Sequence, residues 1–219
     1  VDKILRMNGK SSLLILCSPN NPTGNQFKRN EVETLVQEFD GLVVTDEAYA
    51  DFAKYSMLNR VREFDNLIVL RTFSKAFGLA GIRAGFAASN HSVMNYIKRV
   101  AQPFSIDAVS QRLVASALQN WNYFKKRVNY VLKERKWLFQ ALTKIDGVFP
   151  YPSEANFILF KITREGLSSS IVEKRFQKRN VLVKDRGTFP LLWNCLRVTV
   201  GSHDMNEAFL SALEEALEE

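Results

Sequence analysis

The chain has 219 residues, of which 46% are hydrophobic and 24% charged, a composition typical of folded globular proteins and not of disordered ones. This length allows one large domain or two smaller ones, each able to bury a core. The longest apolar run, Leu13 to Cys17, is too short to cross a bilayer. Cys17 and Cys195 lie in apolar, strand-like runs, which favours reduced thiols in a cytoplasmic protein. The scattered Cys and His residues have no zinc-binding spacing, so we predict no metal site.

The net charge of +7 raises the question of nucleic-acid binding, and the distribution of the charge argues against it. Residues 121–145 carry seven Lys or Arg residues, but apolar residues recur among them at helical spacing. This pattern is typical of an amphipathic helix with a solvated basic face. No RNA- or DNA-binding motif accompanies it, so we predict no nucleic-acid partner and no membrane partner.

The first part of the chain alternates apolar strands with a helix. Val32, Leu35, Val36 and Phe39 have the spacing of one helical face. Short apolar runs bounded by loop residues predict strands over 12–18, 41–45, 67–70 and 85–88. Continuous apolar strands joined through helices are typical of a parallel sheet in an α/β layer.

The second part of the chain has a different order of elements. Helices are predicted over 106–118, 121–145 and 170–179 and at the C-terminal end. Strands are predicted over 157–162, 181–184 and 196–200. These elements do not alternate as strand–helix–strand units, which indicates a smaller α+β domain.

Polar clusters follow three of the predicted strands in the first part. They are Asn20-Asn21, Asp46 with Tyr49, and Ser74-Lys75. Ligands of open α/β sheets bind beyond the carboxyl ends of the strands, where these clusters lie. Taken singly, each residue has an ordinary explanation as a turn, cap or surface residue. Their occurrence at three neighbouring strand ends is what indicates a site.

The chemistry of this set favours a carbonyl cofactor. Apolar and glycine residues crowd Lys75, and a desolvated lysine becomes a nucleophile for aldehydes. Ser74 and Arg83 could hold a phosphate, as a hydroxyl donor and a bidentate fork. A carboxylate at Asp46 could keep a heteroaromatic nitrogen protonated, as an electron-accepting cofactor requires.

The segments SPNNPTGN, TDEAY and TFSKAFGLAGIRAG, in this order and spacing, resemble those of fold-type I aminotransferases that depend on pyridoxal 5'-phosphate (PLP). The DEAY form, the Lys-to-Arg interval and the later CLRVTVG resemble the histidinol-phosphate aminotransferases of that group. The resemblance implies a partial large domain with a mainly parallel sheet over residues 1–118 and a small α+β domain over 119–219. It also implies that the chain is the C-terminal portion of such an enzyme, because no Gly-rich phosphate loop precedes Leu13.

The resemblance implies a PLP-binding role for the residues that match these motifs. Lys75 would form the Schiff base with the cofactor and then shuttle a proton at the substrate carbon. Asp46 would pair with the ring nitrogen, and Asn21 and Tyr49 would bind the phenolate oxygen. Ser74 and Arg83 would bind the cofactor phosphate.

For the substrate, the resemblance implies that Arg197 binds an anionic group. Asn156 matches a loop asparagine that fixes the conformation of the site. Lys184 stands where many relatives have an arginine, and Arg186 follows two residues later, so lysine or arginine could supply a second cation. Lysine cannot form the planar bidentate clamp of arginine, and the substrate therefore stays open at this point.

Three functions follow from these residues. The first is transamination of histidinol phosphate with 2-oxoglutarate or glutamate, by a homodimer. The second is an aromatic amino-acid aminotransferase or a threonine-phosphate decarboxylase-like enzyme. The third, from another class, is a non-catalytic interaction module with an exposed apolar strand edge. We expect this chain alone to bind PLP weakly.

Overall fold

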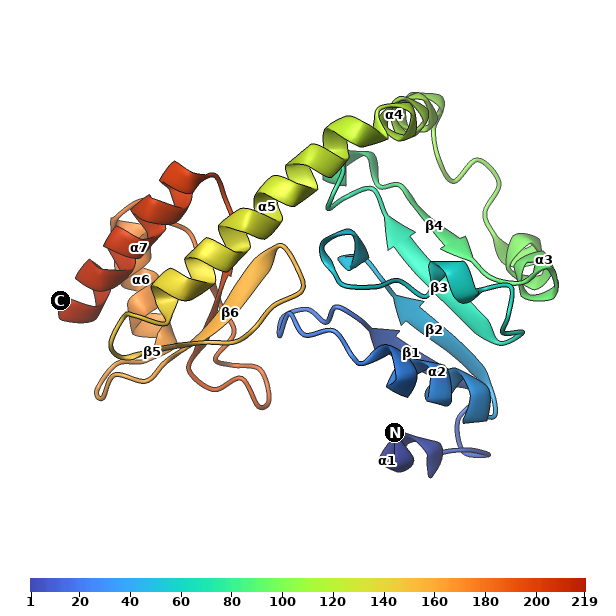
Figure 1. The fold of residues 1–219 in the computed structure, drawn as a ribbon, viewed down its shortest axis with the longest axis horizontal. Helices are drawn as coiled ribbons and strands as arrows, with labels where there is room; N and C mark the ends of the chain where they lie inside the picture. The colour runs from blue at the N-terminus through green and yellow to red at the C-terminus, as the bar shows by residue number, and fades with distance from the viewer. The chain divides into compact units, whose positions relative to one another are not determined.

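The computed structural model describes residues 1–219, and these form two compact units (Figure 1). One unit comprises Val1–Asn20 and Gln26–Lys126, and the other comprises Asn21–Asn25 and Arg127–Glu219. A single continuous helix, α5 (Trp121–Leu142), contributes to both units. The predicted domain boundary after residue 118 therefore stays a prediction.

The first unit contains one four-stranded sheet in the order β1-β2-β3-β4. The first three strands are parallel and β4 is antiparallel to β3, which confirms a mainly parallel sheet. The elements of this unit, in chain order, are α1 (Asp2–Leu5), β1 (Leu13–Cys17), α2 (Arg29–Glu38), β2 (Leu42–Asp46), η1 (Ala50–Phe52), η2 (Leu58–Arg60), β3 (Leu67–Thr72), η3 (Ala80–Ile82), β4 (Gly85–Ala88), α3 (His91–Val100) and α4 (Ala108–Gln119).

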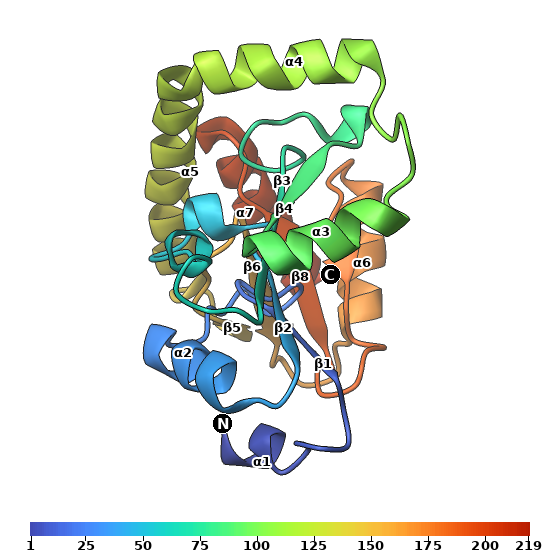
Figure 2. The ribbon, with the colours of Figure 1, turned by 90° about the vertical axis from the view of Figure 1, so that its right-hand side faces the viewer.

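Helix α2 covers one face of this sheet (Figure 2). Its apolar stripe, which includes Val32 and Val36, packs on the side chains of alternate strand residues, among them Val43 and Val69. All four of these side chains are almost fully buried. The spacing that predicted the helix thus also identified the face that it buries.

The other face of the sheet is open at β1. This strand pairs only with β2, so its second edge has no neighbouring strand in this unit. Leu13 and Ile15, which point away from α2, are 49% and 62% exposed. Such an apolar strand at a sheet edge is a surface on which further chain would be expected to pack.

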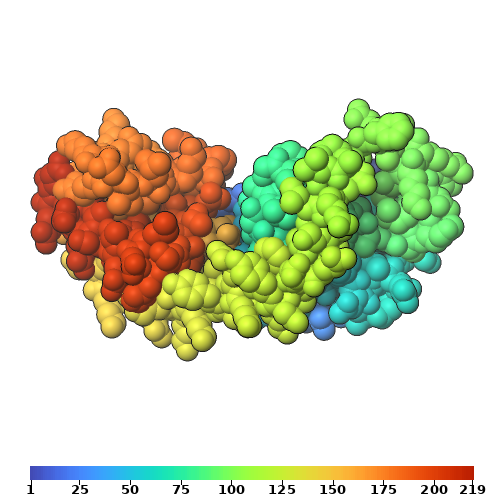
Figure 3. Space-filling view, turned by 90° about the horizontal axis from the view of Figure 1, so that it is seen from above, coloured from blue at the N-terminus to red at the C-terminus, as the bar shows by residue number.

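The second unit is an antiparallel sheet in the order β5-β6-β8-β7, with three helices. Residues of α5, α6, α7 and the sheet form one core, in which the rings of Phe176 and Phe209 stack at 5.4 Å. Helices α6 and α7 lie side by side on the surface of this unit (Figure 3). Besides α5, its elements are β5 (Val148–Pro150), β6 (Phe157–Ile162), α6 (Ser169–Lys178), β7 (Lys184–Asp185), β8 (Cys195–Thr199) and α7 (His203–Glu218).

The strand predicted over residues 181–184 is confirmed only at Lys184. Residues 181–183 are not paired, and β7 contains only Lys184 and Asp185. The reason is that the chain just after α6 folds back on the helix, where the Val181 backbone N–H donates to the Phe176 carbonyl at 3.1 Å. Val181 and Val183 pack against the core as loop residues instead of entering the sheet.

None of the helices in the structure is both long and apolar enough to cross a bilayer.

Candidate active site

The register of the parallel strands brings the three strand ends of the first unit together. Cys17 pairs with Asp46, and Asp46 pairs with Leu70. The residues that follow β1, β2 and β3 therefore emerge at one edge of the sheet. Asp46 is the last residue of β2, and its Oδ1 accepts a hydrogen bond from the Ala48 backbone N–H at 3.1 Å. A carboxylate has two oxygens and several acceptor positions, so this single bond leaves acceptor capacity on Asp46.

Tyr49 and Lys75 meet at this edge. The Lys75 Nζ lies 5.2 Å from the centre of the Tyr49 ring, within the range of a cation–π contact. Tyr49 is only 6% exposed, so its position is fixed by packing. The structure thus brings together a lysine and a tyrosine that the sequence placed on different strand ends.

The expected desolvation of Lys75 is wrong. Phe73 and Ala76 are buried, whereas Lys75 between them is exposed. The apolar neighbours turn inward, where the Phe73 ring packs at 5.0 Å from the ring of Phe77 and 6.0 Å from that of Phe86. The apolar residues on either side of Lys75 therefore pack into the core, and the lysine amine stays accessible to solvent.

Ser74 and Arg83 both lie in the segment that connects β3 with β4. The Ser74 backbone N–H donates to the Thr72 Oγ1 at 3.1 Å, and the two hydroxyls lie 3.0 Å apart. The Phe73 N–H donates to the Ala84 carbonyl at 3.1 Å, which aligns residues 74 and 83 on opposite sides of the turn. A hydroxyl and a guanidinium are therefore positioned at the same end of the sheet as Lys75.

Arg83 has a left-handed backbone, with φ of 52°, and its Nη1 donates to the Ala80 carbonyl at 3.1 Å. Open space adjoins this turn, because a Cβ built on Gly81 would meet no atom within 4 Å. A positive group, a hydroxyl and open space beside them suit a small anion such as a phosphate.

In the second unit, Arg197 contacts an amide and an aromatic ring. Its Nη1 donates to the Asn21 Oδ1, and its Cζ lies 4.9 Å from the centre of the Phe157 ring. Lys184 pairs directly with Arg197 in the register of β7 and β8, so both cations project from the same face. Asn21, Lys184 and Arg197 are thus neighbours.

Asn156 and Asn21 are not brought to the strand ends of the first unit. Asn156 directly precedes β6, and its backbone carbonyl accepts from the Val200 N–H at 2.9 Å. Asn21 belongs by its contacts to the second unit. Its predicted grouping with Asp46 and Tyr49 at one cofactor oxygen therefore stays a prediction.

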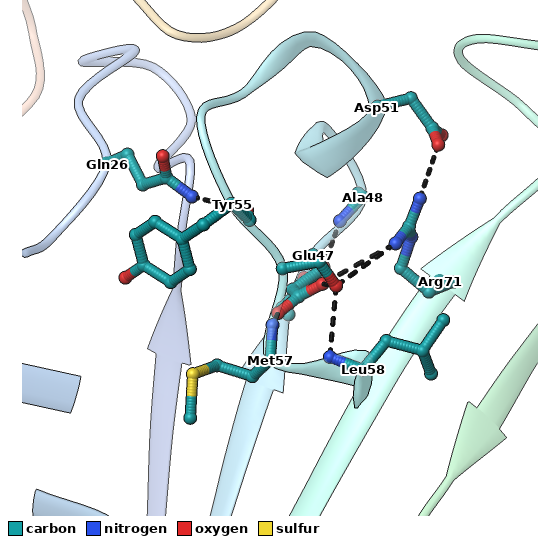
Figure 4. A network of polar contacts seen from close by, with 10 residues as sticks. Gln26, Glu47, Ala48, Asp51, Tyr55, Met57, Leu58 and Arg71 are labelled. Carbon is teal, nitrogen blue, oxygen red and sulfur yellow. Dashed lines mark hydrogen bonds and ion pairs between the residues drawn. The ribbon is translucent and has the colours of Figure 1, made fainter. Parts of the chain in front are cut away.

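A buried network of polar groups that the sequence did not predict is centred on Glu47, the residue after Asp46 (Figure 4). The Glu47 carboxylate accepts from the Met57 backbone N–H at 2.6 Å and from the Ser56 hydroxyl. Arg71 of β3 lies 3.6 Å from Glu47 and forms a second ion pair with Asp51. The only local sign of this network is a charged residue, Arg71, after four apolar residues in β3.

Burial raises the pKa of the Glu47 carboxyl from its ordinary value of 4.5. The hydrogen bonds from Ser56 and Met57 and the charge of Arg71 act in the opposite direction and reduce this rise. Desolvation is the largest effect because Glu47 is only 2% exposed.

The strand order, the antiparallel fourth strand and the separate α+β unit define the fold of type I transferases. The crystal structure of histidinol-phosphate aminotransferase from Sinorhizobium meliloti in complex with pyridoxal-5'-phosphate matches with a TM-score of 0.88 and 24% identity, over 99% of this chain and 61% of that chain. L-threonine-O-3-phosphate decarboxylase from Porphyromonas gingivalis matches with a TM-score of 0.86 and 25% identity, over 95% of this chain and 65% of that one.

The family described as aminotransferase class I and II matches residues 1–213, and the chain belongs to this family. The histidinol-phosphate aminotransferase of Thermoanaerobacter sp. (strain X514) is 41% identical over 205 residues. The match covers 94% of this chain and 57% of that relative, so the chain spans a little over half of the relative's length.

The raised pKa of Glu47 predicts a pH dependence of stability. The folded state keeps the Glu47 proton at pH values where the unfolded chain has lost it. The free energy of unfolding should therefore fall as the pH rises from about 4.5 through the raised pKa. Urea unfolding of the wild type and of Glu47→Gln should show the wild type losing stability relative to the variant over this range. A difference that stays constant or grows with pH would contradict the assignment.

Proposed function

We propose that this chain carries the catalytic lysine of a PLP-dependent aminotransferase. The observation that carries the proposal is the position of Lys75 beside Tyr49, at the sheet edge where Asp46 ends its strand. These three residues come from two separate motifs of the sequence, TDEAY and TFSKAFGLAGIRAG. A purely structural role would not require an accessible amine, a carboxylate and a phenol at one strand-end edge.

The groups present fit PLP by their chemistry. When bound, this cofactor supplies a ring that accepts electrons from a substrate carbon. Asp46 would hold the ring nitrogen in its protonated form, and Tyr49 would bind the phenolate oxygen together with Asn21. The amine of Lys75 would hold the cofactor covalently and, once released, move a proton at the substrate α-carbon.

The phosphate end of the cofactor has its own group of residues. The Ser74 hydroxyl and the Arg83 guanidinium would bind the phosphate, beside the open space at Gly81. The left-handed backbone at Arg83 supports this role, because a strained conformation of a non-glycine residue is often retained for function.

For the substrate, we propose an amino donor with a phosphate, histidinol phosphate, and 2-oxoglutarate or glutamate as its counterpart. The relative from Thermoanaerobacter and the pair of cations at Lys184 and Arg197 support this choice. Asn156 would help to shape the same region. By analogy with the family, we expect a homodimer.

Reduction with borohydride tests the role of Lys75. The protein incubated with PLP should turn yellow, and borohydride should then fix the cofactor covalently on the peptide that contains Lys75, as seen by mass spectrometry. Lys75→Ala should lose this label. Lys98→Ala, which removes an exposed lysine of α3 in the same unit, should keep it. Label distributed over several surface lysines, with none on Lys75, would overturn the assignment.

The length of the chain relative to its relatives predicts weak retention of the cofactor. The face of β1 that carries Leu13 and Ile15 is exposed, and Ser74 and Arg83 supply only two side chains for the phosphate. We expect the 219-residue chain to bind PLP less tightly than when a segment corresponding to the remaining part of the relatives is added in trans. Equilibrium dialysis of PLP measures this difference. Equal dissociation constants with and without the segment would contradict it.

An amino-donor screen decides the substrate. Histidinol phosphate should be preferred over phenylalanine in the natural protein, and Arg197→Met should reduce kcat/KM for histidinol phosphate by about ten- to a hundredfold, because a charge-assisted contact is lost. Release of carbon dioxide from threonine phosphate would indicate the decarboxylase activity named for the Porphyromonas gingivalis protein. A preference for phenylalanine would replace histidinol phosphate as the proposed substrate.

A non-catalytic interaction module is the alternative from another class. The exposed apolar face at β1 is the observation that favours it. Such a protein would not need a lysine that reacts with PLP, so the borohydride experiment also separates this alternative from the enzyme.

A further inference from the structure

Arg71 connects the strand that leads to Lys75 with the loop that carries Tyr49. Its Nη2 forms an ion pair with the Asp51 Oδ1, and its Nη1 lies 3.6 Å from the Glu47 Oε2 (Figure 4). The side chains of Arg71, Asp51 and Glu47 are 13%, 10% and 3% exposed. One cation from β3 is therefore enclosed with two carboxylates from the loop after β2.

The same carboxylate closes this loop upon itself. Glu47 accepts from the Met57 backbone N–H at 2.6 Å and from the Ser56 hydroxyl, and the Ser56 Oγ in turn accepts from the Leu58 N–H at 3.0 Å. The beginning and the end of the segment 47–58 are thus fixed at one point. Tyr49 lies inside this closed segment, where its carbonyl accepts from the Phe52 N–H at 3.0 Å.

The start of this loop is also bonded directly to β3. Glu47 is joined to β3 by its backbone N–H, which donates to the Leu70 carbonyl at 2.9 Å. Arg71 follows Leu70, and Lys75 is four residues further along the chain. A change in how Arg71 holds the loop would therefore change the position of Tyr49 relative to Lys75, whose amine lies 5.2 Å from the Tyr49 ring.

Buried ion pairs contribute little net stability, because desolvation offsets much of the attraction. A loop anchored by apolar side chains would have been at least as stable. A planar guanidinium held by two carboxylates does fix a direction as well as a distance, which a hydrophobic contact does not.

We propose that Arg71, held by Glu47 and Asp51, is a positioning residue that sets the Tyr49 hydroxyl relative to the Lys75 amine. This inference rests on the proposed function, in which Tyr49 binds the phenolate oxygen of PLP and Lys75 holds the cofactor. A hydrogen bond from Tyr49 to this oxygen favours the deprotonated form of the lysine–cofactor linkage and lowers its pKa. Arg71 acts on this pKa through Tyr49 and touches neither the cofactor nor the substrate.

The test is a double-mutant cycle on the pKa of the linkage, followed by the absorbance of the natural protein with PLP across pH. Tyr49→Phe should raise this pKa by about one to two units, as expected for the loss of one hydrogen bond to a charged group. Arg71→Met should raise it by a similar or smaller amount. Arg71→Met combined with Tyr49→Phe should give no further rise beyond Tyr49→Phe alone.

The cycle separates positioning from a direct effect of charge. Removing the positive charge of Arg71 would by itself also raise the pKa of a cationic linkage, but that effect would persist when Tyr49 is replaced by phenylalanine. Equal shifts of Arg71→Met in the two backgrounds would therefore overturn the proposal, as would no shift at all in the presence of Tyr49.

Arg60 provides a matched control. It is also an arginine between two carboxylates in the same unit, at 3.3 Å from Glu33 and 3.0 Å from Glu63, but it lies in η2, away from the strand ends. Arg60→Met should leave the pKa of the linkage unchanged. If Arg71→Met does not fold, Asp51→Asn, which keeps the size of the side chain, should give a smaller rise that again disappears in Tyr49→Phe.

The same absorbance measurements test the proposed function separately from the role of Arg71. A wild-type protein that shows no PLP absorbance would overturn both the function and this inference. A wild-type protein whose linkage titrates normally, with a pKa that Arg71→Met and Asp51→Asn leave unchanged, would overturn only the role of Arg71.

Discussion

The parallel pairing of β1, β2 and β3 determines where the polar groups of the first unit can lie. Parallel strands run in the same direction, so the residues that follow them emerge at one edge, and the register of Asp46 with Cys17 and Leu70 fixes how closely they approach. Beyond the last pair of the ladder, the backbone is released from strand geometry. Asp46 is the last residue of the ladder in β2 and Ser74 lies two residues past the end of β3, while the apolar residues before them stay in the core.

In β3 the change from buried apolar residues to a charged residue takes place within two positions, which puts a charge where little water can solvate it. Leu67 and Val69 are fully buried, yet Arg71 follows two residues later with only 13% of its side chain exposed. An unpaired charge at such a position would be strongly unfavourable, by several kcal/mol. Glu47 and Asp51, which lie in the loop after β2, pair with this charge. Their ion pairs with Arg71 link the conformation of that loop to β3.

Patterns within a few residues allowed most of the fold to be predicted, and interactions between distant residues account for what was not. The apolar stripe of α2 and the runs at β1 and β6 were sufficient because their periodicity reports directly on burial. Helix α3 was missed, although Asn90 caps it by accepting from the Val93 N–H and apolar residues recur along it. None of its residues is buried, so it contributes nothing to the core from which the other helices were inferred. The short β7 shows the reverse error, since Val181 and Val183 have the composition of a strand but lie outside it, with the Val181 N–H bonded to the Phe176 carbonyl of α6.

The same distinction applies to the site. The sequence placed Lys75 correctly at a strand end, since a polar residue after a buried strand is a local signal. It could not show that Phe73 turns inward and leaves the lysine accessible, because this depends on Phe77 and Phe86. Nor could it pair Arg71 with Glu47, because the two residues are 24 positions apart, and only the folded sheet makes them neighbours.

In the second unit, the positive charges of Lys184 and Arg197 indicate what kind of ligand this strand pair could bind. Like charges placed opposite each other in neighbouring strands destabilise a sheet, yet β7 and β8 set Lys184 directly across from Arg197. The contacts of Arg197 with the Asn21 Oδ1 and the Phe157 ring orient its guanidinium. Two adjacent cations on the face of a short strand pair are a cost to folding that an anionic ligand bound by both would offset. In the proposed function this ligand would be the phosphate or carboxylate of the substrate, for which Arg197 would supply the planar fork and Lys184 an added positive charge.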